Sequence, residues 1–291
     1  MHGGCEGQGG KTSHYNHEFA SASDETVAWL KEEWKEKISM LCETYPEKVS
    51  TVMEAVYNYF KCSRGNYMPS HGASHAINTA VNLHKLIEQT DDLSYPYHKE
   101  ELIAAALLHD LVRPYEVHEN NGIVPNGDKA CKAAYEIAEK IFPKESARRI
   151  EMVVRYHDDP SSPEIEGDVK EMVSLLRVAD ILDVDEQRVL AAVGEYRKVN
   201  GYYLPREVIR DKLKRKAEFD IATVRKACRD PDLVGMVERH YVLLLNQIEA
   251  LLEEEEQEVR KEIERATKLA ELYEEACLEA MREVVEGKRL S

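Results

Sequence analysis

The stretch AALLHDLVRP, residues 105–114, places two ionisable side chains at the end of an apolar run. His109 and Asp110 follow five small or apolar residues, and Leu111 and Val112 come directly after them. A run of this kind is expected inside a fold, and burying a charge without a partner is costly. The stretch therefore predicts a buried partner for the two ionisable side chains.

The composition is that of a charge-rich globular chain with a large acidic excess. Of 291 residues, 43% are hydrophobic and 32% are charged, and 55 acidic against 39 basic residues leave a net charge of −16. This charge disfavours binding to nucleic acids or anionic membranes, which need clustered Lys and Arg. It permits a small phosphorylated substrate, because a local cation is enough to hold one.

Three further features bear on the compartment. No segment approaches the ~20 apolar residues that a membrane-spanning helix needs. The six cysteines form no CxxC pair, which disfavours a zinc knuckle or a redox dithiol. The first residues, MHGGCEGQGG, lack the apolar core of a signal peptide. We therefore expect a cytoplasmic protein that does not enter a membrane.

Hydrophobic spacing indicates an all-α fold. Apolar residues recur at steps of three or four, for example at Val27, Leu30, Trp34, Ile38 and Leu41. Prolines and glycines separate such segments, and no convincing strand run is present. Helices are expected at about 47–62, 71–90, 98–113, 128–142, 144–158, 168–193, 206–229 and 231–286.

The same pattern divides the chain into three parts. Residues 1–22 are rich in Gly, Ser and His and are expected to be a disordered tail, residues 23–200 a helical core, and residues 201–291 a C-terminal helical extension. The last helix carries a broken apolar stripe among charged faces. Two interpretations of it remain open: it docks on the core, or it pairs with a second copy of the chain in a homo-oligomer.

Ionisable residues interrupt apolar faces at four places in the core. They are His71 with His75, the adjacent pair His109-Asp110, His157, and Asp180. A single residue of this kind is usually structural, but several together favour a shared divalent cation. Imidazole and carboxylate ligands suit Mn²⁺, Fe²⁺, Co²⁺, Ni²⁺, Zn²⁺ or Mg²⁺. Because the ligands come from separate helices, such an ion would also tie a helical bundle together.

The order H…HD…D on helices resembles the HD-domain metal-dependent phosphohydrolase superfamily. The matching residues are His75 in SHAIN, His109-Asp110 in LLHDL and Asp180 in RVADILD, over roughly residues 65–195. The resemblance implies an HD-domain helical bundle, here with an extra long C-terminal helix. It also implies that these four residues are ligands of one metal ion.

Two further histidines receive roles from the same resemblance. The spacing of His71 and His75 is similar to the HNxxH element of cyclic-nucleotide phosphodiesterases, which makes His71 the expected general acid, although Gly72 stands where that element has Asn. With Asp110, His71 completes the expected catalytic pair. His157 matches a ligand of a second metal. A further second-metal histidine is missing near 128–131, so the site holds one ion and a second remains open; Asp128 or His118 are the alternatives for its ligand.

Cations close to the expected ligands are the candidates for binding phosphate. Arg113 follows Asp110 by three residues, Lys129 begins the next expected helix, and Arg177 precedes Asp180 by three residues. Transfer of a phosphoryl group needs positive charge to balance the charge that spreads over its oxygens. These three side chains are therefore the expected substrate contacts.

Two segments next to the expected ligands give weaker indications of a role at the site. The connection PYEVHENNGIVPNG, residues 114–127, is long and polar, and we expect it beside the HD pair, where such loops set specificity. Gln187 and Arg188 follow the last ligand, and we expect them on a solvated helix face.

Together these features predict a phosphomonoesterase or phosphodiesterase that cleaves a phosphate ester of a nucleotide or another small phosphorylated metabolite through a metal-activated water. One alternative is a di-iron oxygenase of the same fold, which needs six ligands, of which the chain offers five clear matches. Another is a non-catalytic regulatory helical module that uses its charged last helix as an interface.

Overall fold

A computed structural model describes residues 24–62, 69–89, 98–111 and 128–290 of the chain. Within these ranges every regular element is helical, which confirms the all-α prediction. None of the helices described there combines the length and the apolar character needed to cross a membrane. The elements are α1 Asp24–Thr44, α2 Lys48–Cys62, the 3₁₀ turn η1 Pro69–His71, α3 Ala73–Gln89, α4 Lys99–Leu108, α6 Asp128–Ala138, α7 Lys144–Tyr156, α8 Gly167–Leu182, α9 Glu186–Asn200, α10 Arg206–Ala227, α11 Pro231–Glu253 and α12 Glu256–Leu290.

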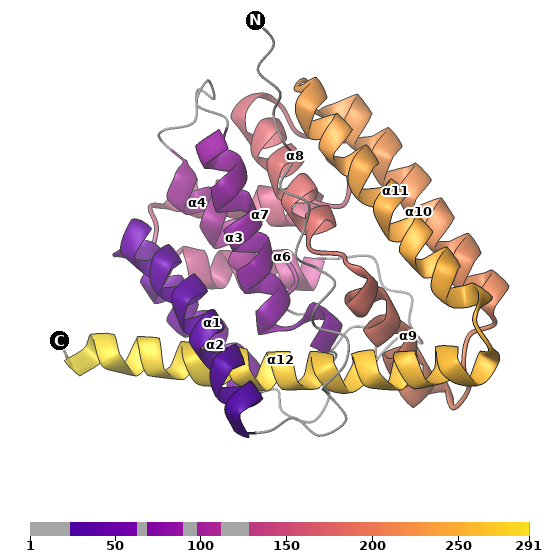
Figure 1. Cartoon of the computed structure of the whole chain (residues 1–291). Coiled ribbons are helices and arrows are strands. Elements are labelled where there is room, and N and C mark those ends of the chain that lie inside the picture. The colour runs from indigo at the N-terminus through magenta and orange to yellow at the C-terminus, as the bar shows by residue number, and fades with distance from the viewer. Residues whose placement is uncertain (1–23, 63–68, 90–97, 112–127, 291) are drawn as a thin grey trace, which may run out of the picture.

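Helix α4 is buried in the helical bundle and packs against α2, α3, α7 and α8, which Figure 1 labels. All residues from Glu101 to Leu111 are buried. The segment Ala104–Ala106 lets neighbouring helices approach closely, because alanine side chains leave little volume between backbones. The apolar run that carries the His109-Asp110 pair is therefore the inner helix of the bundle, as its composition indicated.

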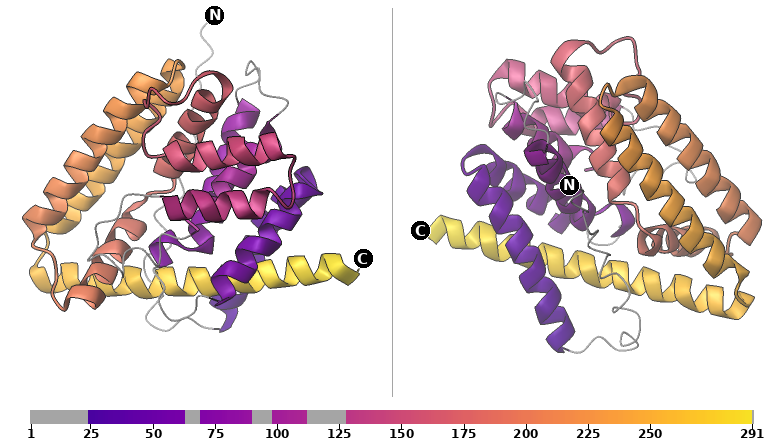
Figure 2. Two further views of the ribbon diagram at one scale, coloured as in Figure 1. Left: turned by 180° about the vertical axis from the view of Figure 1, so that it is seen from behind. Right: turned by 45° about the horizontal axis from the view of Figure 1, so that its top comes forward.

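The C-terminal helices enclose this core on two sides. Helices α10 and α11 form a hairpin along one side, against α8, and α12 then crosses beneath the bundle and contacts α1, α2, α3 and α9 (Figures 1 and 2). The apolar stripe of α12, including Val259, Ile263, Ala276 and Met281, is buried within the chain. The last helix therefore docks on the core, one of the two interpretations of its sequence.

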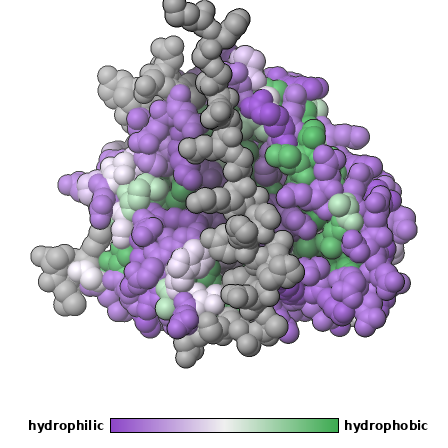
Figure 3. Space-filling model, in the orientation of Figure 1, coloured by the Kyte–Doolittle hydropathy of each residue, from purple (hydrophilic) through white to green (hydrophobic). Residues whose placement is uncertain are grey.

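The outer surface agrees with the high charge content. The face shown in Figure 3 is largely hydrophilic, and apolar side chains gather mainly toward the side formed by α10 and α11. Phe219 on α10 and Val242 and Leu243 on α11 are among the exposed large apolar residues.

The expected helix over 168–193 is wrong, because the chain divides there into α8 and α9. Asp185 has an extended backbone, and its carboxylate accepts a hydrogen bond from the backbone N–H of Arg188 at 2.8 Å. An aspartate in this position satisfies an N–H that a helix start leaves unpaired. Because no proline or glycine marks the break, the apolar pattern continued across it.

The expected single helix over 231–286 is also wrong. It divides at Glu254 and Glu255 into α11 and α12, which run in different directions (Figure 2). The break falls in the run Glu253–Glu256, where like charges at neighbouring helical positions repel one another. The reversal lets the apolar faces of both helices reach the same core.

Candidate metal centre

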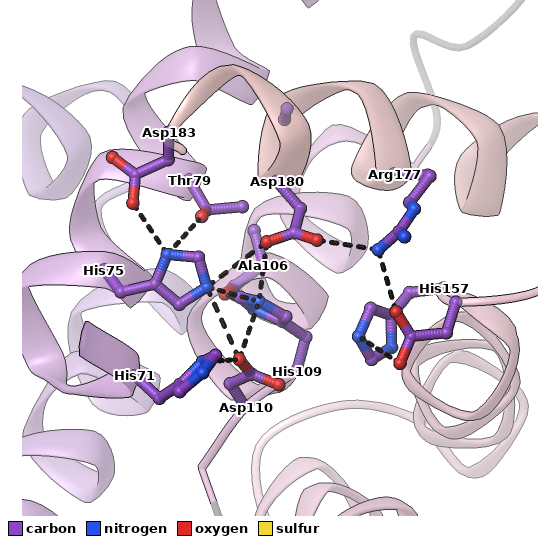
Figure 4. Close-up of polar contacts among 12 residues, drawn as sticks. His71, His75, Thr79, Ala106, His109, Asp110, His157, Arg177, Asp180 and Asp183 are labelled. Carbon is purple, nitrogen blue, oxygen red and sulfur yellow. Dashed lines mark hydrogen bonds and ion pairs between the residues drawn. The ribbon is translucent and has the colours of Figure 1, made fainter. Parts of the chain in front are cut away.

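The candidate ligands come from four helices whose ends meet at one point (Figure 4). His75 lies in the first turn of α3, and His109 is the residue that ends α4, with Asp110 directly after it. Asp180 lies near the end of α8, whose last residue is Leu182. The HD pair thus sits in the turn after α4 and not inside a helix that continues to residue 113, as the sequence had suggested.

The donor atoms of these residues have the spacing of a coordination shell. The Nε2 atom of His75 lies 2.9 Å from Nε2 of His109, 3.3 Å from Oδ1 of Asp180 and 3.5 Å from Oδ2 of Asp110. Ligands about 2.1 Å from an ion in tetrahedral or octahedral geometry are about 3.0–3.5 Å apart. His75, His109 and Asp180 form one group whose donor atoms lie within 4.8 Å of one another, and these residues fit a divalent cation. Asp110 lies against both imidazoles and belongs to the adjoining groups with His71 and with His157.

The histidine rings are oriented for coordination by hydrogen bonds on their other nitrogen. Nδ1 of His109 donates to the carbonyl oxygen of Ala106 at 2.7 Å, and Nδ1 of His75 donates to Oδ2 of Asp183 at 2.7 Å. A proton held on Nδ1 leaves the Nε2 lone pair available to a metal. Carbonyl and carboxylate acceptors behind the rings are the usual partners of metal-binding histidines.

The charges at the centre favour a cation. Burial and then the charge of Arg188 favour a neutral His75, but hydrogen bonds with Asp110, Asp180 and Asp183 outweigh them and raise its pKa to about 10. Burial alone would raise the pKa of Asp180, yet contacts with His109, His75 and a nearby arginine hold it well below its usual range. The Asp180 carboxylate therefore stays ionised at neutral pH and attracts positive charge.

His157 extends the cluster on the far side of His109. It directly follows α7, as predicted, it is buried, and its Nδ1 donates to the carbonyl oxygen of Val154 at 2.7 Å. Its ring centroid lies 5.1 Å from that of His109, and His109, Asp110 and His157 form a second group of donors close enough to share an ion. Burial lowers the pKa of His157, so the neutral ring that a metal requires is favoured.

His71 lies at the open side of the centre. It is the last residue of η1, just before α3, and its Nδ1 donates to Oδ2 of Asp110 at 2.9 Å. Its side chain is 27% exposed, whereas that of His75 is 2% exposed. His71, His75 and Asp110 also form a group that could hold an ion. The geometry thus allows His71 to carry a proton or to bind a metal.

Arg177, one of the expected phosphate contacts, is buried between carboxylates. Its Nη1 donates to Asp158 at 2.8 Å and to Oδ2 of Asp180 at 2.9 Å, and its Nη2 donates to Asp220 at 2.6 Å. These bonds join α8 to α10 and orient the Asp180 carboxylate. The other candidates, Arg113 and His118, lie outside the described residues, as do the side chains of Asp128 and Lys129 at the start of α6.

Several residues at the centre were not recognised as such in the sequence. Asp183 follows Asp180 by three residues, which on a helix indicates one face, and this spacing was the available signal. Arg188, expected on a solvated face, forms an ion pair with Asp183, and its side chain is only 14% exposed. That expectation was wrong because the break before α9 turns Arg188 back toward the centre.

Two buried glutamates hold the turn that carries His71 and the start of α3. Glu195 of α9 accepts a hydrogen bond from the backbone N–H of Ser70 at 2.9 Å. Glu274 of α12 accepts from the backbone N–H groups of Ala73 at 2.8 Å and Ser74 at 2.9 Å. The C-terminal helices therefore position the histidines from outside the ligand-bearing segment.

The chain matches one known family. Residues 72–186 match the family model of the HD domain, and this range contains His75, His109, Asp110, His157 and Asp180. Neither the curated proteins nor the solved structures contain a match to the chain. Helices α9 to α12 lie outside the matched range, apart from the first residue of α9.

Proposed function

We propose that this chain, whose residues 72–186 form an HD domain, is a metal-dependent phosphohydrolase. Its substrate would be a phosphate ester of a nucleotide or of another small phosphorylated metabolite. The observation that carries the proposal is the convergence of His75, His109 and Asp180, whose donor atoms lie within 4.8 Å of one another, with Asp110 3.5 Å from Nε2 of His75. A scaffold protein would have no physical need for these buried carboxylates.

A divalent cation at this position supplies Lewis acidity, which lowers the pKa of a water nucleophile and polarises the phosphoryl group. The protein contributes the geometry of the reaction. Asp183 and the carbonyl oxygen of Ala106 keep the Nε2 atoms of His75 and His109 directed toward the ion. Four proposed ligands from three helices, α3, α4 and α8, keep that position fixed while the substrate changes.

His71 is the proposed general acid. Its Nδ1–H is held by Asp110, and the carboxylate stabilises the protonated ring. A proton on Nε2 is then available for the oxygen that leaves phosphorus. The partial exposure of His71 supports this role, because the group must reach the substrate.

We assign several cations to balance the negative charge of the phosphate. Arg113 and Lys129 remain proposed phosphate contacts. Arg177 acts mainly on Asp180, because its guanidinium already serves three carboxylates. His157, together with His109 and Asp110, is the proposed place for a second ion.

Metal analysis of the purified protein combined with a phosphate-release screen tests the proposal. The screen would cover nucleotides, cyclic nucleotides and sugar phosphates under added Mn²⁺, Mg²⁺, Ni²⁺ or Co²⁺. We expect a bound divalent metal and hydrolysis of at least one class, which Asp110→Ala abolishes. Asp159→Ala is the matched control, because Asp159 is an exposed aspartate close to His157 in the chain and outside the ligand set.

Three results would contradict the proposal. Full activity of the Asp110→Ala variant would show that the assigned site is not the catalytic site. A protein that contains iron, consumes oxygen and releases no phosphate would be an oxygenase. A protein that binds no metal and hydrolyses nothing would be a non-catalytic helical module.

A further inference from the structure

A cavity of about 400 Å³ opens directly beside the metal centre. Its lining includes His71, Asp110, His157 and Asp180, and it also includes a wall of residues from α9 and α10. This wall belongs almost entirely to the part of the chain outside the HD-domain match. Whatever this wall selects is therefore a property of this chain's C-terminal helices.

Within the described residues, the wall contributes one positive charge that is not paired with a carboxylate. Among the described residues, the lysines and arginines that line the cavity are Arg177, Arg188, Lys212 and Lys216. Arg177 and Arg188 are ion-paired, and Lys216 lies 3.0 Å from Asp220. Lys212, one helical turn before Lys216, forms no ion pair within the described part of the chain. The ammonium group of Lys212 is therefore available to a ligand in the cavity.

The rest of the wall is apolar. Its residues are Val189, Ala192 and Val193 on α9, and Leu204, Ile209 and Leu213 on or just before α10. Tyr196 lies beside them, with its hydroxyl bonded to that of Tyr202 at 2.8 Å. Inorganic phosphate or a sugar phosphate gains nothing from such a surface, whereas an aromatic or aliphatic group is stabilised by leaving water.

We propose that the substrate is a phosphate ester whose organic part is aromatic or otherwise apolar, such as a nucleobase, and that this part lies against α9 and α10. Lys212, which lines the same cavity as the metal-centre residues, contributes positive charge for the phosphate of the substrate. This inference rests on the proposed function for the identity of the reacting group. The cavity volume is within the range of about 300–1,000 Å³ that holds small organic ligands.

Equilibrium binding to the manganese-loaded full chain tests the wall without requiring turnover. The probes are adenosine 5′-monophosphate, inorganic phosphate and methyl phosphate, each measured by titration calorimetry. For the unmodified chain we expect adenosine 5′-monophosphate to bind at least about tenfold more tightly than the other two probes, because only it has an aromatic group. Equal affinities for all three would overturn the proposal.

Two substitutions separate the roles of charge and apolar surface. We expect Lys212→Gln to lower the affinity for all three probes about tenfold, which is the loss typical of one charge-assisted contact. Lys212→Arg is expected to restore the affinity. We expect Ala192→Phe to lower the affinity for adenosine 5′-monophosphate alone by a similar factor, because the added ring fills the apolar part of the cavity. Both positions are solvent-exposed, so the fold is retained.

Arg215→Gln is the matched control, because Arg215 lies on the same helix, is exposed and does not line the cavity. If Lys212→Gln binds like this control, the assignment of Lys212 is wrong. If the binding pattern is as expected but no ester is hydrolysed, the proposed function fails and the wall assignment stands. Hydrolysis of phosphate esters with no preference for an apolar group would overturn the wall assignment alone.

Discussion

Replacing Glu274 by glutamine would test whether α12 holds the start of α3 in place. Glu274 is 3% exposed, and its carboxylate accepts three hydrogen bonds: from the N–H of Ala73 at 2.8 Å, from the N–H of Ser74 at 2.9 Å and from the hydroxyl of Ser74 at 2.8 Å. It therefore satisfies two N–H groups at the N-terminus of α3, two residues before the ligand His75. The substitution keeps the size of the side chain and removes its charge.

The expected loss can be worked out from these bonds. Oε2 accepts both bonds from Ser74, and Oε1 accepts the bond from Ala73. A glutamine oxygen can replace Oε2, but its NH₂ group then faces the N–H of Ala73. One buried N–H left without an acceptor costs about 1–3 kcal/mol. Removing a negative charge from a helix N-terminus costs about a further 1 kcal/mol. We therefore expect Glu274→Gln to lower the free energy of unfolding by about 2–4 kcal/mol.

Urea denaturation followed by circular dichroism would measure this loss. Glu271→Gln is the matched control, because Glu271 lies one turn earlier on α12 and pairs with Lys198 at the surface, where such pairs contribute at most about 1 kcal/mol. A Glu274→Gln variant as stable as the Glu271→Gln variant would refute the reasoning. It would show that the N-terminus of α3 is held by other contacts.

Three further predictions concern the same region. Asp183→Ala removes the acceptor of the His75 Nδ1 proton, and we expect metal affinity to fall by about 10–100-fold in a chelator competition assay. An unchanged affinity would mean that the ring needs no support. Arg177→Met leaves three carboxylates without their shared cation, and we expect a loss of about 3–5 kcal/mol in urea denaturation; a loss below about 1 kcal/mol would argue against this role. Burial alone would raise the pKa of Glu101, but hydrogen bonds from Arg149 lower it below its value in the unfolded chain. The pair therefore adds stability above the unfolded pKa of 4.5, and this stability is lost as the pH falls through the folded pKa. The stability difference between the natural chain and Glu101→Gln should shrink on acidification from pH 6, and a constant difference in urea midpoints across that range would contradict the assignment.

Much of the candidate site was predictable because its residues break an apolar pattern. An ionisable residue inside a buried helix must find a partner, and His109, Asp110, His157 and Asp180 all lie next to apolar runs. Periodicity then places each of them on, or directly after, a helix whose apolar face is buried. The all-α class followed from the same periodicity, since most of the expected helices coincide with observed ones to within a few residues.

The errors have a common physical origin. The breaks after Asp183 and at Glu254 depend on where a neighbouring surface needs the next helix, and the apolar spacing continues across both. Arg188 was expected in solvent because its own helix face is polar. It lies inside because the turn before α9 directs it toward Asp183.

By itself, the sequence determined that the chain forms helices, that several of them carry candidate metal ligands, and that these residue types suit a divalent cation. These properties depend on residues close together in the chain. Tertiary structure alone decided that Glu274, 200 residues after Ser74, accepts hydrogen bonds at the start of α3, and that α10 lines the cavity beside the candidate metal centre. Contacts of this kind form only when the whole core is assembled, because their geometry depends on how distant helices pack and on no local pattern.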